Sequence, residues 1–135
     1  MNSERLHRRN LCRSKKPIHW KAVAVFLPLL AALFLVTRYC MPALYTPEWA
    51  ARHVFWPAAL IILLMAALGR IRFSTAALIG YIVGLAAGEC FGGFRSAIPP
   101  QYLHYGWLIL IVLLALSAAA GILWERRRAQ IKPPA

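Results

Sequence analysis

The feature that most constrains this chain is a series of four long apolar segments separated by short polar connections. A run of about 18 or more apolar residues is long enough to cross a hydrocarbon core roughly 30 Å thick. Hydrophobic residues make up 61% of the 135-residue chain, and its mean hydropathy is +0.59. One soluble core of this size cannot bury so much apolar surface. We therefore expect an all-α integral membrane protein, a bundle of four transmembrane helices.

The second apolar stretch, residues 54–69, is short for a transmembrane helix, so we place its start earlier. Thr46 suits an N-cap, Pro47 suits the first helical position, and Glu48 suits the positive end of the helix dipole. Basic segments, 1–20 and 125–135, flank the transmembrane domain, residues 21–124. Within that domain the expected helices cover about residues 21–40, 47–69, 73–94 and 105–124.

The distribution of Lys and Arg predicts the orientation of the bundle. Of the 16 basic residues, only Arg38, Arg52 and Arg95 lie at the end opposite the two termini. Cytoplasmic flanks collect positive charge during insertion, so we expect an integral protein of the bacterial cytoplasmic membrane with both termini inside. The basic face should attract anionic lipid headgroups. Nucleic-acid binding is not indicated, because the basic stretch RLHRRNLCRSKK has no aromatic side chains on which bases could stack.

Small residues recur every fourth position along the third expected helix. Residues four apart lie nearly above one another on an α-helix, so glycines at every fourth position form a ridge without side chains along one face. In lipid, helices associate through close van der Waals approach, which such a ridge permits. Ser117 and Gly121 offer a matching pair on the fourth helix. The ridge could meet the fourth helix, the first helix or a second copy of the chain. We call the following residues the glycine ridge: Gly80, Gly84, Gly88 and Gly92.

The third helix also carries an acid, Glu89, one position away from the glycine ridge. An ionised carboxylate below the headgroups needs a partner or water, because desolvation disfavours its charged form. Candidate partners from the same layer are Arg38, Arg52, His53 and Arg95. Two interpretations remain open: a proton-responsive or ion-responsive site, and a structural ion pair that joins the first three helices.

Aromatic and histidine side chains gather in the same layer. Trp49, Arg52, His53 and Trp56 recur at helical spacing and so share one face of the second helix. His104 lies in the second outer connection, among further aromatic residues. An interfacial aromatic belt is one interpretation of this composition. Binding of a ligand, a lipid headgroup or a partner subunit is the other.

The remaining chemistry-bearing residues are sparse. Cys40 and Cys90 are expected near the outer ends of the first and third helices, as a possible disulfide or as small apolar fillers. No Cys and His spacing resembles a metal site. The chain has four acidic residues and no Walker loop, dinucleotide fingerprint or HExxH motif. The sequence therefore predicts neither an enzyme nor a cofactor.

Two functional hypotheses from different classes follow. The first is a non-enzymatic membrane subunit or accessory protein that assembles, with itself or a larger membrane partner, through the glycine ridge. The second is a small oligomeric transporter or channel in which Glu89, with Arg38 or Arg52, handles a proton or an anion. The second hypothesis requires oligomers, because four helices leave little room for a central pathway.

Overall fold

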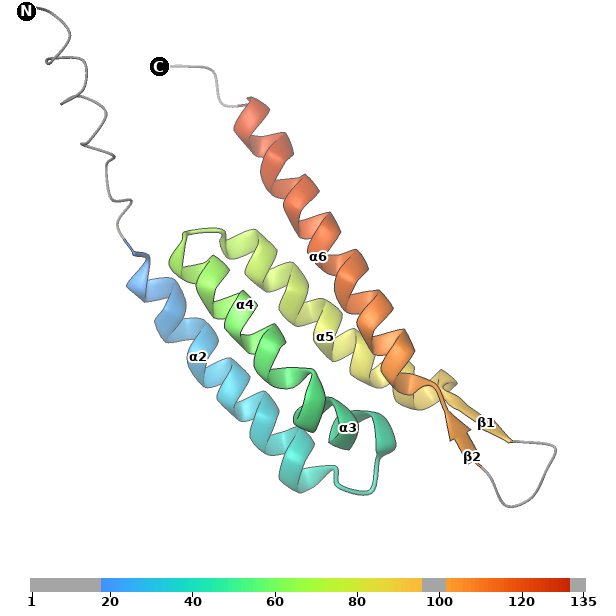
Figure 1. Ribbon diagram of the computed structural model, residues 1–135. Helices are drawn as coiled ribbons and strands as arrows, with labels where there is room; N and C mark the ends of the chain where they lie inside the picture. Colours follow the sequence, from blue (N-terminus) through green and yellow to red (C-terminus); the bar gives the residue numbers. More distant parts are fainter. Residues whose placement is uncertain (1–17, 96–101, 132–135) are drawn as a thin grey trace, which may run out of the picture.

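The computed structural model describes residues 18–95 and 102–131, and its first and last long helices lie at the two edges of the bundle with the other helices between them (Figure 1). The expected N-terminal segment, 1–20, therefore lies almost wholly outside the described residues. In chain order, the elements are α2 (Trp20–Leu35), η1 (Val36–Cys40), α3 (Tyr45–His53), α4 (Phe55–Ala67), α5 (Ile71–Phe91), β1 (Gly93–Arg95), β2 (Tyr102–His104) and α6 (Gly106–Ile131).

Three described helical segments are long and apolar enough to cross a membrane: Trp20–Cys40, Ile71–Phe91 and Gly106–Arg127. A fourth span exists if α3 and α4 are counted together, although these two helices are bent by 63° relative to each other. The described part of the chain is thus mostly helical, and its helices are compatible with an integral membrane protein of three or four spans.

The second expected helix, 47–69, is not one continuous helix. It is divided at Val54 into α3 and α4. Pro57 explains the position of the break, because its ring lacks an N–H and clashes with the carbonyl of His53, four residues earlier. Pro28, by contrast, lies inside α2, which continues through it as a single helix.

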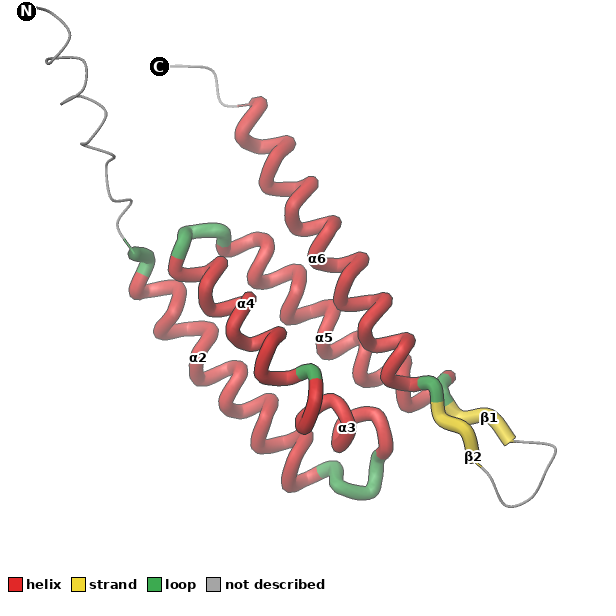
Figure 2. The backbone as a smooth tube through the Cα atoms, in the orientation of Figure 1, coloured by secondary structure: helices red, strands yellow, loops and turns green. Residues whose placement is uncertain are grey.

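The ends of the other helices also differ from expectation. The first expected helix, 21–40, finishes in the wider π-helical turn of η1. The third ends at Phe91, and residues 93–95 pair with 102–104 as a short antiparallel hairpin (Figure 2). The fourth helix is longer than expected and ends at Ile131, so much of the basic segment 125–135 is helical.

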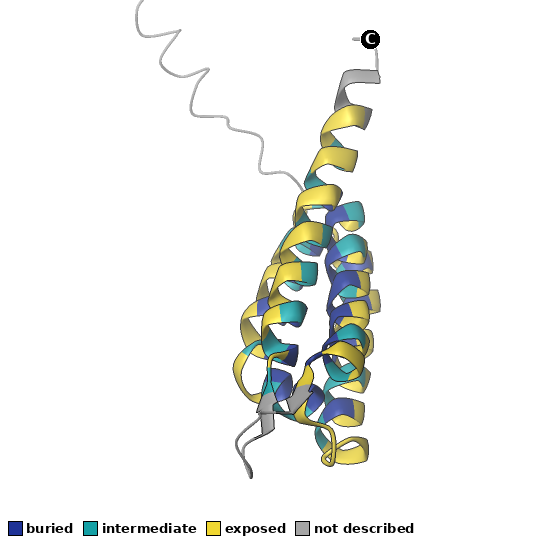
Figure 3. Cartoon of the chain, turned by 90° about the vertical axis from the view of Figure 1, so that its right-hand side faces the viewer, coloured by how far each residue is buried: buried dark blue, intermediate teal, exposed yellow. Residues whose placement is uncertain are grey.

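The central element of the bundle is α5. In its apolar window 44% of the residues are buried, against 22% for the first span and 17% for α6. The core contains Phe26 from α2, Phe55 and Ile62 from α4, Tyr81 from α5 and Leu110 from α6. Helix α4 lies between α2 and α5 (Figure 1), and much of the surface of α6 is exposed along its length (Figure 3).

The turn between α4 and α5 requires a glycine. Gly69 has a φ of 79°, which L side chains rarely adopt, and a Cβ there would lie 2.6 Å from the ring of His19. The amide of Arg70 donates to the carbonyl of Met65, and that of Gly69 donates to the carbonyl of Ala66. This pairing is a Schellman motif, which ends α4 and lets α5 return antiparallel beside it.

The glycine ridge packs against α6 of the same chain. A Cβ on Gly80 would overlap the side chain of Ser117, and one on Gly84 would lie 3.1 Å from the Cα of Leu110. Further along, a Cβ on Gly88 would lie 2.6 Å from the carbonyl oxygen of Gly106. Because the ridge has no side chains, the backbones of α5 and α6 approach closely over this whole length.

This contact can be tested at Gly80. We expect Gly80→Ala to lower the free energy of unfolding by about 1–3 kcal/mol, the range for overpacking a close contact. Ser117→Gly makes room for the new methyl group. The double variant should therefore lose less free energy of unfolding than the two single variants lose in total. Unfolding in mixed detergent micelles, followed by circular dichroism, measures all three variants.

Val83 provides the matched control on the same helix, because its side chain is 49% exposed. Val83→Leu should leave the free energy of unfolding unchanged. Strictly additive effects of Gly80→Ala and Ser117→Gly would contradict a direct contact between these two positions.

Candidate functional site at the α3 end of the bundle

The acid on α5 binds the beginning of α3. The backbone N–H of Thr46 donates to Oε2 of Glu89 over 2.9 Å. The first amides of a helix lack partners inside the helix and carry its positive dipole end, so a carboxylate is favourable there. The N-cap residue of α3 is Leu44, which supplies no side-chain cap, and not Thr46 as expected from the sequence. Glu89 therefore takes the capping role from a neighbouring helix.

Glu89 also faces His104, at the junction of β2 and α6. The Nε2 atom of His104 lies 3.9 Å from Oε2 of Glu89. The backbone N–H of Gly106 donates to Nδ1 of the same ring over 3.2 Å, so the neutral ring carries its proton on Nε2, towards the acid. The ring of Tyr45 packs on His104 with a centroid distance of 4.6 Å. The carboxylate of Glu89 thus joins α3, α5 and the start of α6.

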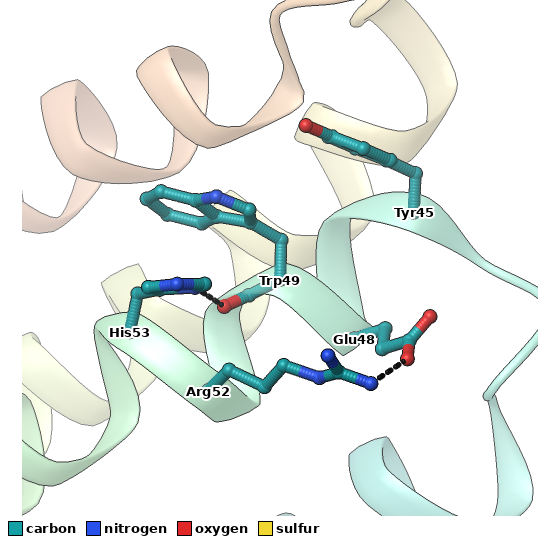
Figure 4. Close-up of a pocket in the computed structure, with 5 residues that line it drawn as sticks. All are labelled: Tyr45, Glu48, Trp49, Arg52 and His53. Atoms are coloured by element: carbon teal, nitrogen blue, oxygen red, sulfur yellow. Dashed lines mark hydrogen bonds and ion pairs between the residues drawn. The ribbon is translucent and has the colours of Figure 1, made fainter.

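The two arginines expected to pair with Glu89 pair instead with Glu48. Nη2 of Arg52 lies 2.6 Å from Oε1 of Glu48 (Figure 4), and Nη1 of Arg38 lies 3.7 Å from the same oxygen. Among the described residues, neither arginine forms an ion pair with Glu89. The sequence did contain a signal for one of these pairs, because Glu48 and Arg52 are four residues apart on one helix.

Aromatic contacts connect α3 to α6 beside these ion pairs. Trp49 stacks on His53 with a centroid distance of 5.0 Å and an interplanar angle of 25°, and it packs against Trp107 at 5.8 Å. His53 Nδ1 lies 3.0 Å from the carbonyl oxygen of Trp49, and among the described residues His53 forms no ion pair with Glu89. A shallow pocket of about 190 Å³ lies on this surface, lined by Tyr45, Glu48, Trp49, Arg52 and His53 (Figure 4).

A larger groove of about 470 Å³ lies between the end of the first span, α3 and α5. We call it the Glu89 groove, after the residue that lies at its α5 wall beside Cys90; Thr37 and Met41 line the opposite wall. This groove separates η1 from α5. Accordingly, Cys40 and Cys90 are free, exposed thiols, and the disulfide that the sequence permitted is not formed.

Sequence reasoning did not identify the role of Thr46. Its side chain is fully buried, and its Oγ1 has no hydrogen-bond partner among the described residues. Its Cγ2 would lie 2.8 Å from a Cβ on Gly88, and a Cβ on Gly106 would overlap its hydroxyl. The side chain of Thr46 therefore fills the space where α3, α5 and α6 meet. The backbone N–H of the same residue donates the hydrogen bond that Glu89 accepts.

The remaining candidate residues from the sequence are Arg95, Gly92 and Gly121. Arg95 is the last residue of β1, and its side chain lies outside the described part of the structure. Gly92 and Gly121 continue the contact between α5 and α6, because a Cβ on Gly121 would lie 3.0 Å from the Cα of Phe73. Within residues 18–95 and 102–131, no three His, Cys, Asp or Glu side chains gather as a metal site.

No family model, curated protein or solved structure matches this chain. The contacts of the α3 end are therefore the basis for assigning a function. These contacts can hold a short helix in place, keep charges paired and present two grooves or pockets to the surroundings.

The capping contact of Glu89 can be tested by substitution. We expect Glu89→Ala to lower the free energy of unfolding by about 1–2 kcal/mol, the usual cost of losing a helix N-terminal cap. Glu89→Gln should cost less, because its amide oxygen still accepts the hydrogen bond. Hydrogen exchange measured by mass spectrometry should show faster exchange of the Thr46 amide in the Ala variant.

Glu48→Ala is the control for charge removal at the same end. Its partners are partly exposed, so this change should cost no more than about 1 kcal/mol and leave the exchange of Thr46 nearly unchanged. Equal acceleration at Thr46 in both Ala variants would contradict a specific cap by Glu89.

Proposed function

We propose that this chain is a small, non-enzymatic membrane subunit or accessory protein of the bacterial cytoplasmic membrane. In this proposal both termini are cytoplasmic and the α3 end faces outward. The observation that carries it is the use of the acids at the α3 end. Glu89 accepts the Thr46 amide, and Glu48 accepts from Arg52. Acids committed to holding α3 in place suit a structural role better than an ion-transfer role.

The buried polar groups along the bundle support the same proposal. The hydroxyl of Thr37 donates to the carbonyl of Leu33, and that of Ser74 donates to the carbonyl of Ile62. Side chains that line an ion pathway must instead offer donors or acceptors to the ion. Among the described buried hydroxyls only those of Thr46 and Tyr81 lack partners, and they lie on different elements. No continuous polar path follows from these positions.

Assembly in this proposal uses the outward side of α6, since α6 itself covers the glycine ridge. Only 17% of the apolar window of α6 is buried. Ala115 and Ala119 are exposed and four residues apart, between the exposed side chains of Val112 and Leu123. A pair of small residues at this spacing permits the close helix approach on which association in lipid depends.

A second candidate, a small oligomeric transporter, is favoured by one observation. Glu89 is about a quarter exposed, faces His104 and lies at the wall of the Glu89 groove. The 3.9 Å between Glu89 and His104 is too long for direct proton transfer, so in this candidate one water molecule bridges the carboxylate and the imidazole. In this candidate Glu89 and His104 replace the pairing of Glu89 with Arg38 or Arg52.

The assembly surface can be tested with Ala119→Leu. We expect this change to weaken association of copies in liposomes at least roughly tenfold, or about 1.4 kcal/mol, because the larger side chain keeps the helices apart. Subunit counting by single-molecule photobleaching measures the association. Ala24→Leu on the exposed side of α2 is the control and should have no effect. A wild-type chain that is monomeric and partnerless in native membranes would contradict the proposal.

Reconstitution distinguishes the two candidates. We expect the wild-type protein in proteoliposomes to show no pH-dependent flux of protons or common anions, whereas Glu89→Gln should change only stability. Dye-based flux assays with an empty-liposome control measure this. Wild-type flux that Glu89→Gln abolishes without loss of folded protein would reject the subunit proposal and establish the transporter.

A further inference from the structure

A second groove, of about 300 Å³, runs between α2 and α4. We call it the α2–α4 groove; Leu30, Ala31 and Phe34 line its α2 side, and Trp56, Ala59 and Leu63 line its α4 side. It differs from the Glu89 groove in having no ionisable residue in its lining. Its volume falls at the lower end of the range of about 300–1,000 Å³ that is usual for small-molecule sites.

Both walls of this groove lead to an arginine at the α3 end. On one wall, Arg38 follows Phe34 by four residues along the first span, and on the other, Arg52 stands four residues before Trp56, across the break at Val54. The two guanidinium groups meet at one oxygen of Glu48, at 3.7 Å for Arg38 and 2.6 Å for Arg52. These two distances show that the two arginines lie close together, although neither is part of the groove lining itself.

This end of the groove carries an excess of positive charge. One carboxylate balances only one of the two guanidinium groups. The side chains of Arg38 and Arg52 are 37% and 56% exposed, so both are accessible to an additional anion. At 3.7 Å the contact of Arg38 with Glu48 is longer than a hydrogen bond, which leaves its N–H donors available.

We propose that the α2–α4 groove binds one phospholipid with an anionic headgroup. An acyl chain lies between α2 and α4, and the phosphate contacts Arg38 and Arg52. The forked donors of guanidinium groups match phosphate oxygens, and they are less heavily hydrated than an ammonium group. This inference goes beyond the proposed function and holds for a subunit or a transporter alike.

The position of Trp56 agrees with a lipid headgroup at this end of the groove. Trp56 is 62% exposed and its ring packs on Phe34 at a centroid distance of 5.4 Å, in the first turn of α4 after the break at Val54. Tryptophan is enriched at the level of the lipid headgroups, where its apolar ring and its N–H are both satisfied. The apolar groove, the interfacial tryptophan and the two arginines therefore follow the order of an acyl chain, its glycerol region and its phosphate.

The experiment must detect the lipid that lies in the groove itself, because the basic termini also attract anionic lipids. We place the photo-crosslinker benzoylphenylalanine at Leu35, which lines the groove, in liposomes of equal phosphatidylglycerol and phosphatidylcholine with identical acyl chains. Mass spectrometry of the adducts should show about a tenfold enrichment of phosphatidylglycerol, equivalent to 1.4 kcal/mol. The crosslinker at Ala32, which is exposed on α2 but outside the groove lining, should show no enrichment.

Three further variants separate headgroup recognition from the acyl-chain site. Arg38→Gln with Arg52→Gln should remove the enrichment, whereas Arg38→Lys with Arg52→Lys should retain part of it and confirm that the fold tolerates change here. Ala31→Trp fills the groove from an exposed position and should reduce adducts of both lipids. Arg72→Gln, at the opposite end of the bundle, should leave the enrichment unchanged.

Other outcomes overturn the proposal. Equal adducts of the two lipids in the wild-type chain would reject recognition of an anionic headgroup. Adducts to a second protein chain at position 35 would show that a helix occupies the groove instead of a lipid. Loss of enrichment in the Arg72→Gln variant would assign the preference to the opposite end of the bundle.

Discussion

The close approach of α5 and α6 is the contact on which the rest of this structure depends. Helices in lipid gain little from the hydrophobic effect when they associate, so they depend on dense packing. Here the glycine ridge lets the backbone of α5 lie against Leu110 and Gly106 of α6. This contact places the first turn of α6 beside Glu89 and Thr46. The polar contacts of the α3 end follow from it.

The break at Val54 is the second determinant of the α3 end. A straight helix from 47 to 69 would carry Glu48 and Arg52 along the axis of α4. Because Pro57 interrupts the hydrogen bonding, α3 is bent by 63° from α4, and its first turn meets the carboxylate of Glu89. Its opposite side brings Glu48 to Arg38. The break at Val54 thus gives Glu89 and Glu48 two different sets of partners.

These two acids illustrate a general property of polar groups near a membrane surface. A carboxylate there needs partners, but several kinds of partner satisfy it equally well. Glu89 obtains a backbone amide and an imidazole, while Glu48 obtains two guanidinium groups. Arg38 and Arg52 line neither groove, whereas Glu89 lies in the wall of the Glu89 groove. The two acids therefore give the α3 end one contact centred on a carboxylate and one in which cations are in excess.

Local sequence properties determined the helical segments and their apolar character. Length and composition decide whether a segment can cross a membrane, and the bare ridge on α5 follows from the spacing of its glycines alone. The break in the second helix was not expected from the sequence, which predicts one helix over 47–69. Pro57 explains the break, but Pro28 lies inside an unbroken helix, so a proline alone does not decide between the two.

The tertiary structure alone decided which surfaces meet. It placed α6 over the glycine ridge, brought Glu89 to Thr46 and His104, and brought Arg38 to Glu48. Such choices join residues far apart in the chain, and many pairings of the same helices satisfy the same local rules. Only the combined packing of α3, α5 and α6 selects one of them.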